Sequence, residues 1–155
     1  MSRSPAVLVR DFHELYGVPV RSTTEPAVDI ERAHLRMDLI AEEFAELVEA
    51  MYGKIAALLV REAFLTATRH DDHTRDTIGT ADALADLVYV IYGMALETGV
   101  DLDSVLAEVH LSNRSKLGVD GKPILRHDGK VLKGPGFFPP DIATVLGVEP
   151  SGVAS

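Results

Sequence analysis

Four glutamates lie close together in residues 41–49, namely Glu42, Glu43, Glu46 and Glu49. At about 100° per residue, a helix places three of them within a narrow arc, with Glu43 beside them. No Lys or Arg separates them, although a solvated helix face usually pairs acids with bases at four-residue spacing. Like charges this close repel, so we expect a cation here, and hard divalent metal ions take oxygen ligands. The alternative is that these acids form only the solvated side of an amphipathic helix.

A second acidic site is predicted on a helix that is otherwise apolar. Asp86 is the only charged residue in the run 83–96, and such a helix is expected to be buried on every side. A carboxylate in these surroundings needs a cation, strong hydrogen-bond donors or a metal ion. Asp82 lies one turn before Asp86. It is either a second ligand or an acid in the first turn of the helix, where the helix dipole favours one.

The two acidic sites together predict a metal centre. If their helices pack antiparallel, their carboxylates would surround one cavity. Ligands that are all oxygen favour Mg²⁺ or Mn²⁺ over zinc. The acids concerned are Glu42, Glu43, Glu46 and Asp86.

A basic segment follows, although the formal net charge of the chain is −9. A carboxylate–metal centre beside cations suits polyphosphate chemistry, because the metal bridges phosphate oxygens and the cations take the remaining charge. The alternative is an ordinary solvated loop. The cationic side chains of this segment are His110, Arg114, Lys116, Lys122, Arg126, His127, Lys130 and Lys133.

Hydrophobic periodicity predicts an all-α fold. Apolar residues recur at steps of three and four from about residue 29 to 65, across Gly53, which interrupts the pattern without necessarily ending the helix. The main apolar stripe of this helix is formed by Met37, Ile40, Phe44, Val48 and Met51. Further helices are predicted at 6–17, 80–98 and 102–116, with Asp101 as the N-cap of the last. Residues 66–77 are predicted to be a loop, 124–126 and 130–132 a short hairpin, and 142–146 one helical turn.

These elements predict one domain over residues 1–155, with a core at about 8–142 and a frayed tail at 147–155. With only three substantial helices, one of them apolar all round, a single chain would leave apolar surface uncovered. We therefore expect an antiparallel helical bundle completed by homodimerisation, or by a dimer of dimers.

Composition narrows the function further. The absence of cysteine excludes disulfides and thiolate sites, and an acidic chain is a poor candidate for general nucleic-acid binding. No signal-like segment and no apolar run of about 20 residues is evident. We therefore expect a soluble, cytoplasmic protein that has neither a membrane nor nucleic acid as a partner.

The motifs resemble those of the MazG-type all-α nucleotide pyrophosphohydrolases, a superfamily that includes dimeric dUTPases and phosphoribosyl-ATP pyrophosphohydrolases. The resemblance covers roughly residues 8–142. It rests on Glu42-Glu43-x-x-Glu46 and on Asp86 in Ala-Asp-Leu-Val-Tyr-Val. Phe12-His13-Glu14, the segment from Glu108 to Lys116 and the Asp-Gly-Lys…Pro-Pro-Asp tail resemble the dUTPase-like branch.

This resemblance implies an oligomeric helical bundle that uses Mg²⁺ to cut a nucleoside triphosphate into a monophosphate and pyrophosphate. By position, Glu42, Glu46 and Asp86 would be metal ligands, and Glu43 a ligand or the base that activates water. Asn113 and Lys116 would contact the nucleotide or its phosphates. From the basic segment we add Lys122, Lys130 and Lys133 as candidate phosphate contacts. Resemblance to the dUTPase-like branch favours dUTP as the substrate, although a non-standard nucleotide fits the same phosphate chemistry.

One position departs from the family pattern. The second motif is Glu-x-x-Asp, and its glutamate position is Ala83 here. Asp82 either replaces that glutamate, or one metal ion is lost, or activity is weak. The alternative function is therefore a non-catalytic or weakly active homologue that binds a nucleotide or a partner helix.

Two other metal sites are less favoured. A di-iron bundle uses Glu-x-x-His from two helices, and this chain has the pattern once, from Glu31 to His34. The run His70-Asp71-Asp72-His73 lies in the predicted loop, where a solvated turn is the simpler interpretation.

Overall fold

The computed structural model describes residues 4–149, which form two compact units. Unit 2 comprises residues 25–81, and unit 1 comprises residues 1–24 and 82–155, of which 1–3 and 150–155 lie outside the described residues. The described residues contain six α-helices and no β-strand, so the predicted all-α class is confirmed. The tail prediction for 150–155 falls outside the described part, and the single-domain prediction stays a prediction.

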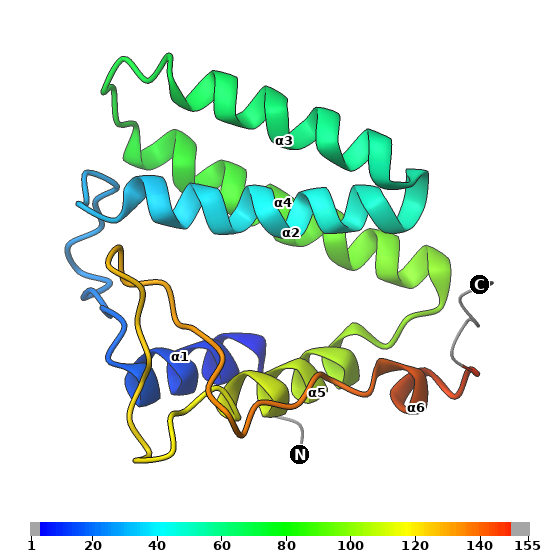
Figure 1. The fold of residues 1–155 in the computed structure, drawn as a ribbon. Helices are drawn as coiled ribbons and strands as arrows, with labels where there is room; N and C mark the ends of the chain where they lie inside the picture. The colour runs from blue at the N-terminus through cyan, green and yellow to red at the C-terminus, as the bar shows by residue number, and fades with distance from the viewer. Residues whose placement is uncertain (1–3, 150–155) are drawn as a thin grey trace. The chain divides into compact units, whose positions relative to one another are not determined.

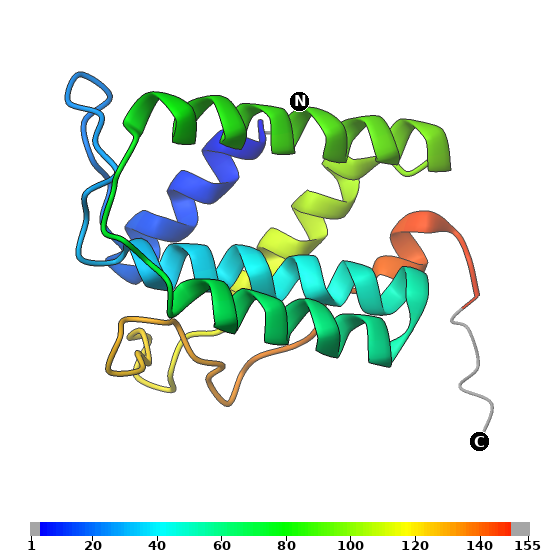
Figure 2. The same ribbon diagram turned by 90° about the horizontal axis from the view of Figure 1, so that it is seen from above.

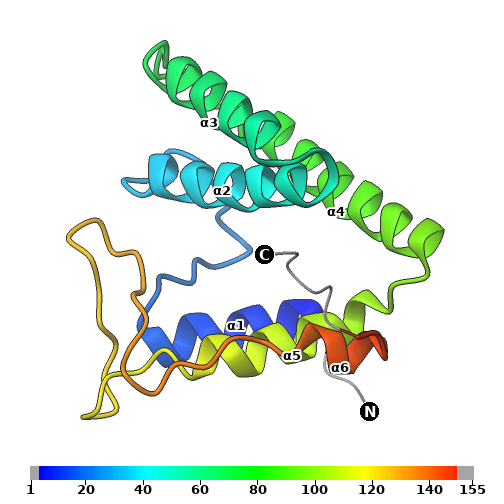
Figure 3. The same cartoon turned by 45° about the vertical axis from the view of Figure 1, so that its right-hand side comes forward.

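Unit 2 is built around a helical hairpin of α2 (Ala33–Tyr52) and α3 (Lys54–Thr68), which lie side by side in Figures 1 and 3. The single long helix predicted for 29–65 is therefore wrong. Gly53 separates the two helices at φ 89° and ψ 171°, a conformation essentially confined to glycine. The periodicity continued through the glycine because both helices are amphipathic, so the pattern alone did not reveal the turn.

The packing face of α2 also differs from the predicted one. The buried residues of α2 are Leu35, Ala45 and Val48, and Ala57 is the buried residue of α3. The predicted core stripe contains Val48, but its other members Met37, Ile40, Phe44 and Met51 are exposed. α3 packs beside that stripe rather than on it, which leaves an apolar strip on α2.

Unit 1 contains α1 (Pro5–Tyr16), α5 (Leu102–Arg114) and the short α6 (Ile142–Leu146), with α5 packed against both α1 and α6. Pro5 opens α1, and Gly17 ends it in the left-handed conformation, as the sequence predicted. The predicted N-cap Asp101 is confirmed, since its carboxylate accepts a hydrogen bond from the Ser104 amide at 3.2 Å.

The fourth helix, α4 (Thr77–Thr98), is one continuous helix of 22 residues (Figure 2). It begins three residues before the predicted start, because Asp76 accepts a hydrogen bond from the Gly79 amide at 3.0 Å and caps the first turn. Gly99 follows its end at a positive φ of 72°, as expected for a helix stop.

The segment after α5 is irregular. Its predicted hairpin is confirmed as a single antiparallel bridge between Leu125 and Val131. The Arg126 amide donates to the Lys130 carbonyl at 2.8 Å, and the Leu132 amide donates to the Ile124 carbonyl at 2.8 Å. This short hairpin carries Lys130, one of the predicted phosphate contacts.

Candidate active site

The predicted metal ligands of unit 2 all lie in the middle of α2. Glu42 is half-buried, whereas Glu43, Glu46 and Glu49 are exposed. Glu42 and Glu46 are one turn apart, so a single rigid helix spaces them by about 6 Å. α2 therefore presents several carboxylates with little conformational freedom between their backbones.

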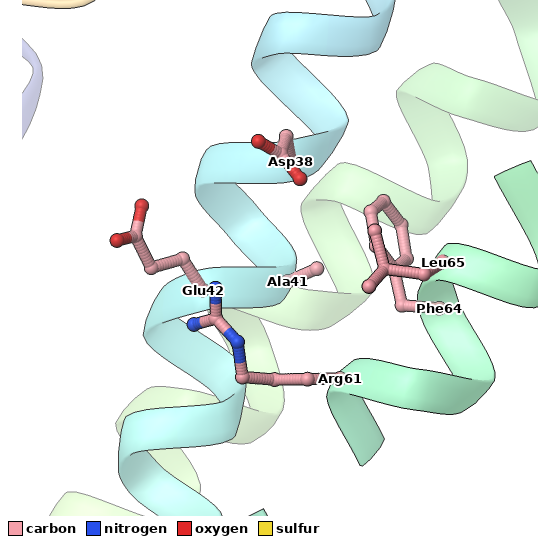
Figure 4. Close-up of a pocket in the computed structure, with 6 residues that line it drawn as sticks. All are labelled: Asp38, Ala41, Glu42, Arg61, Phe64 and Leu65. Carbon is pink, nitrogen blue, oxygen red and sulfur yellow. The ribbon is translucent and has the colours of Figure 1, made fainter. Parts of the chain in front are cut away.

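A small pocket lies beside this acidic face, between α2 and α3 (Figure 4). From α2 it is lined by Asp38, Ala41 and Glu42, and from α3 by Arg61, Phe64 and Leu65. Asp38 and Arg61 were not singled out from the sequence. Asp38 could have been found, because it lies four residues before Glu42 on the same helix face. Arg61 could not, because a continuous helix over 29–65 would not fold it back toward Glu42.

The acids of unit 1 lie on α4. Asp82 is the sixth residue of this helix, beyond its first turn, so the interpretation of Asp82 as a residue that complements the helix dipole is wrong. The interpretation as a metal ligand is the one left open.

The predicted burial of α4 is also wrong for the single chain. Asp86 and every other residue from 81 to 91 are exposed, and Ala95 is the buried residue of α4. Over the described residues of unit 1, α5 packs closely against α1 and α6, and α4 is joined to α5 by the hydrogen bond of 2.7 Å from the Tyr92 hydroxyl to the Asp103 carboxylate. The apolar composition of α4 is therefore not explained by the helix packing within unit 1.

The donors of the two acidic sites match Mg²⁺ in chemical type, since all are carboxylate oxygens and the chain has no cysteine. Within either unit, over residues 4–149, no three His, Asp or Glu side chains come together closely enough to hold a metal ion. Glu42, Glu43 and Glu46 belong to unit 2, and Asp82 and Asp86 to unit 1. Their convergence on one ion therefore stays a prediction.

Several polar residues of the α5 motif hold the C-terminal segment. The Ser112 hydroxyl donates to the Phe138 carbonyl at 2.7 Å, and the Phe138 amide donates to the Ser115 hydroxyl at 3.0 Å. The Asp141 amide donates to the Glu108 carboxylate at 2.9 Å. These contacts give part of the motif a structural role and account for the buried hydroxyl of Ser112, which is 3% exposed.

α1 fixes the other side of α5. The Tyr16 hydroxyl donates to the carbonyls of Asn113 and Arg114 at 2.8 and 3.0 Å, and burial raises the pKa of Tyr16. The Arg114 guanidinium donates to the Asp11 carboxylate at 2.9 Å. Nε2 of His110 lies 3.0 Å from the same Asp11 oxygen, but without the geometry of a hydrogen bond. The end of α5 is thus held in place just before Lys116.

The predicted phosphate contacts are distributed over several turns. The Gly134 amide donates to the Lys116 carbonyl at 2.9 Å, which brings the backbones beside Lys116 and Lys133 together. The ammonium of Lys133 lies 4.5 Å from the centre of the Phe137 ring. Lys122 lies in its own turn, closed by the bond from the Gly118 amide to the Lys122 carbonyl at 2.8 Å. Arg126 is paired with Asp128, so that cation is already engaged.

The sequence profile of the phosphoribosyl-ATP pyrophosphohydrolase family matches residues 9–113 of this chain. The chain belongs to this family. The matched region runs from α1 to the end of α5 and contains both acidic sites, whereas Lys116, Lys122, Lys130 and Lys133 lie beyond it.

A solved structure supports the same family at the level of the fold. The chain is similar to an inferred NTP pyrophosphohydrolase from Exiguobacterium sp. 255-15, with 26% identity, a TM-score of 0.68, and coverage of 95% of this chain and 94% of the other. No protein of curated function matches the sequence. The family and this structure indicate a hydrolase of the NTP pyrophosphohydrolase kind.

The family also bears on α4. By length and composition alone this helix could cross a membrane. The sequence did not indicate this, because Asp82 and Asp86 interrupt the apolar run. Core helices of soluble proteins pass the same test. Membership of this family indicates a soluble protein, so we interpret α4 as a helix that packs against protein.

Proposed function

We propose that this protein hydrolyses a nucleoside triphosphate to its monophosphate and pyrophosphate in a reaction that requires Mg²⁺. The observation that carries the proposal is the family match over residues 9–113, which includes the glutamates of α2 and Asp86 of α4. The carboxylate donors of both sites are of the type that Mg²⁺ prefers.

We assign a role in this reaction to each of the predicted site residues. Glu42, Glu46 and Asp86, with Asp82, would hold Mg²⁺, which when bound withdraws charge from the phosphate oxygens. Glu43 would accept a proton from the attacking water as its oxygen bonds to the α-phosphorus. The bond from that phosphorus to the bridging oxygen breaks, and pyrophosphate leaves with its electron pair. Asn113, Lys116, Lys122, Lys130 and Lys133 would bind the nucleotide and its phosphates.

The substrate is proposed by chemical class. A deoxynucleoside or ribonucleoside triphosphate fits, with dUTP or a non-standard nucleotide as the first to test. A panel of triphosphates assayed for pyrophosphate release, with Mg²⁺, with Mn²⁺ and with a chelator, identifies the base and sugar. Release that continues unchanged under chelation would exclude the metal-dependent reaction.

The role of Glu43 has a direct test. Glu43→Gln keeps the shape of the side chain and removes its basicity, so we expect kcat to fall about 10²- to 10⁴-fold. The matched control is Glu62→Gln, because Glu62 is an exposed glutamate on α3 that does not line the pocket. Equal activity of the two variants would contradict the role of Glu43.

A second function is favoured by one residue. Ala83 stands where the family motif has glutamate, which supports a homologue that binds a nucleotide or a partner helix with weak or no catalysis. Nucleotide binding by calorimetry, without pyrophosphate release for any member of the panel, would select this function.

We also propose that the protein is a homodimer, or a dimer of dimers. Most of α4 is apolar and exposed in the single chain, with Ile78, Tyr89 and Leu96 more than 80% exposed. Patches of this kind on a soluble protein mark interfaces with other proteins, and a second copy of the same chain is the simplest partner.

A further inference from the structure

The α2–α3 pocket contains a cation that the proposed reaction has not used. Arg61 extends from α3 toward α2 and lines this pocket together with Glu42 (Figure 4). Asp38 lines the same pocket from one turn earlier on α2. The pocket therefore places an arginine next to one of the proposed metal ligands, within a single compact unit.

Arg61 differs from several other arginines of the chain in its partners. Arg75, Arg114 and Arg126 each pair with an aspartate, namely Asp71, Asp11 and Asp128. Over residues 4–149, Arg61 forms no ion pair and no hydrogen bond with any carboxylate. Its five N–H donors therefore line the same pocket as two carboxylates and are bonded to neither of them.

This arrangement suits an anion that is bound only when the metal is present. A guanidinium matches the oxygens of a phosphate with two parallel hydrogen bonds. A triphosphate bound through a metal ion at Glu42 would bring phosphate oxygens to the side of α2 that Arg61 faces. Before the nucleotide binds, the positive charge of Arg61 reduces the repulsion between Asp38 and Glu42.

We propose that Arg61 is a phosphate-binding residue of this site, and that it compensates the charge of Glu42 and Asp38 until the nucleotide arrives. The inference rests on the proposed function. It has a consequence that a packing role does not share, because a cation beside a metal ligand weakens metal binding and strengthens phosphate binding. Removing Arg61 should therefore move the two affinities in opposite directions.

The experiment compares Arg61→Ala, Arg61→Lys and Arg69→Ala in the full-length protein. Arg69 is the matched control, because it follows α3 directly, is exposed, and its guanidinium donates to the Thr66 hydroxyl at 3.1 Å. Binding of Mg²⁺ alone is measured by calorimetry without nucleotide. KM and kcat are measured by pyrophosphate release, and thermal unfolding reports on packing.

For Arg61→Ala we expect Mg²⁺ to bind about threefold to tenfold more tightly, because a nearby positive charge is removed. We expect kcat/KM to fall about tenfold to hundredfold, because charge-assisted hydrogen bonds to phosphate are lost. Arg61→Lys should restore the wild-type Mg²⁺ affinity but recover only part of kcat/KM, since lysine lacks the two-pronged geometry. Arg69→Ala should match the wild type in both measurements.

Two results would overturn this inference and leave the proposed function intact. One is a wild-type kcat/KM in Arg61→Ala while Glu43→Gln abolishes turnover. The other is a weaker Mg²⁺ affinity accompanied by a lower Tm, which would assign Arg61 to the packing of the helical hairpin. If the wild-type protein releases no pyrophosphate from any triphosphate, the proposed function fails first and the inference falls with it.

Discussion

Single residues of the α5 motif divide into two groups in the structure. Glu108, Ser112 and Ser115 bind the C-terminal segment through hydrogen bonds of 2.7–3.0 Å. Asn113 contributes its carbonyl to Tyr16, which leaves its side-chain amide out of that contact. A motif that resembles a substrate-binding element thus carries structural and proposed functional residues at alternating positions, because neighbouring residues of a helix face different directions.

Position 83 distinguishes the proposed hydrolase from the proposed weakly active or non-catalytic homologue. Ala83→Glu restores the family acid, and at about 60° from Asp86 around the helix its carboxylate can converge with that of Asp86. If the missing acid limits activity, we expect kcat to rise about tenfold or more with Mg²⁺. A tenfold rise requires the added carboxylate to lower the activation free energy by about 1.4 kcal/mol. Steady-state kinetics measure this. A decrease in kcat would show that Asp82 already occupies the acidic position.

The loop before α4 is organised around one aspartate. The Arg75 guanidinium donates two hydrogen bonds of 2.9 Å to Asp71 and, with the His73 amide, holds the pKa of Asp71 well below its ordinary value. Nε2 of His34 lies 3.0 Å from the same carboxylate, which joins the loop to the start of α2. The predicted solvated turn is therefore closed by its own polar contacts.

This gives a pH-dependent prediction. A lowered pKa in the folded state contributes stability above the unfolded value, about 3.9, and loses it as the pH falls toward the folded value. We expect Asp71→Asn to have a lower Tm than the wild type at pH 7, with the difference narrowing below about pH 4. Thermal unfolding from pH 7 to pH 2.5 measures it, with Glu62→Gln as control. A constant difference would show that the ionised carboxylate does not contribute.

Among the helices, the break between α2 and α3 determines how unit 2 packs. It converts one long amphipathic pattern into a hairpin and places Arg61 beside Glu42. The turn needs only one residue, because Gly53 adopts a backbone conformation that residues with a Cβ atom rarely reach.

Substituting this glycine should be costly even though there is room for a methyl group. No atom lies within 4 Å of a Cβ built at Gly53, so the penalty in Gly53→Ala is conformational and about 1–3 kcal/mol of unfolding free energy. The control is Gly136→Ala, where space is also open but φ is not positive, so no penalty of this kind is expected. Denaturant unfolding measures both. A neutral Gly53→Ala would contradict the assigned conformation.

Apolar surface is exposed on both units of the single chain. It includes most of α4 and the strip on α2 formed by Met37, Ile40, Phe44 and Met51. A soluble protein of this family is expected to cover such surface with another protein, and self-association is the simplest way.

The homodimer can be tested without touching the proposed active site. We expect sedimentation to give a dimer or tetramer, and the double variant Ile91→Arg and Leu96→Arg to dissociate it, because burying an unpaired charge in an interface costs several kcal/mol. Val119→Arg is the control, since Val119 is 92% exposed in a loop. A wild-type monomer would contradict the proposal, and a double variant that stays oligomeric would exclude α4 from the interface.

The sequence alone was sufficient for features that depend on neighbouring residues. The helical class, the stop at Gly17, the cap at Asp101 and the short hairpin around Asp128 and Gly129 follow from local backbone chemistry, and the structure confirms them. The family also followed from the sequence, because the acids keep their order and spacing along the chain.

Which helix faces meet depends on tertiary packing. Periodicity gives the direction of a side chain around its own helix but not which neighbour it contacts, so the break at Gly53, the buried face of α2 and the placement of Arg61 were not predicted. The same limit explains α4, whose apolar residues were assigned to a core and are exposed in the single chain. Burial depends on what packs against a surface, and the apolar pattern of one helix does not identify that neighbour.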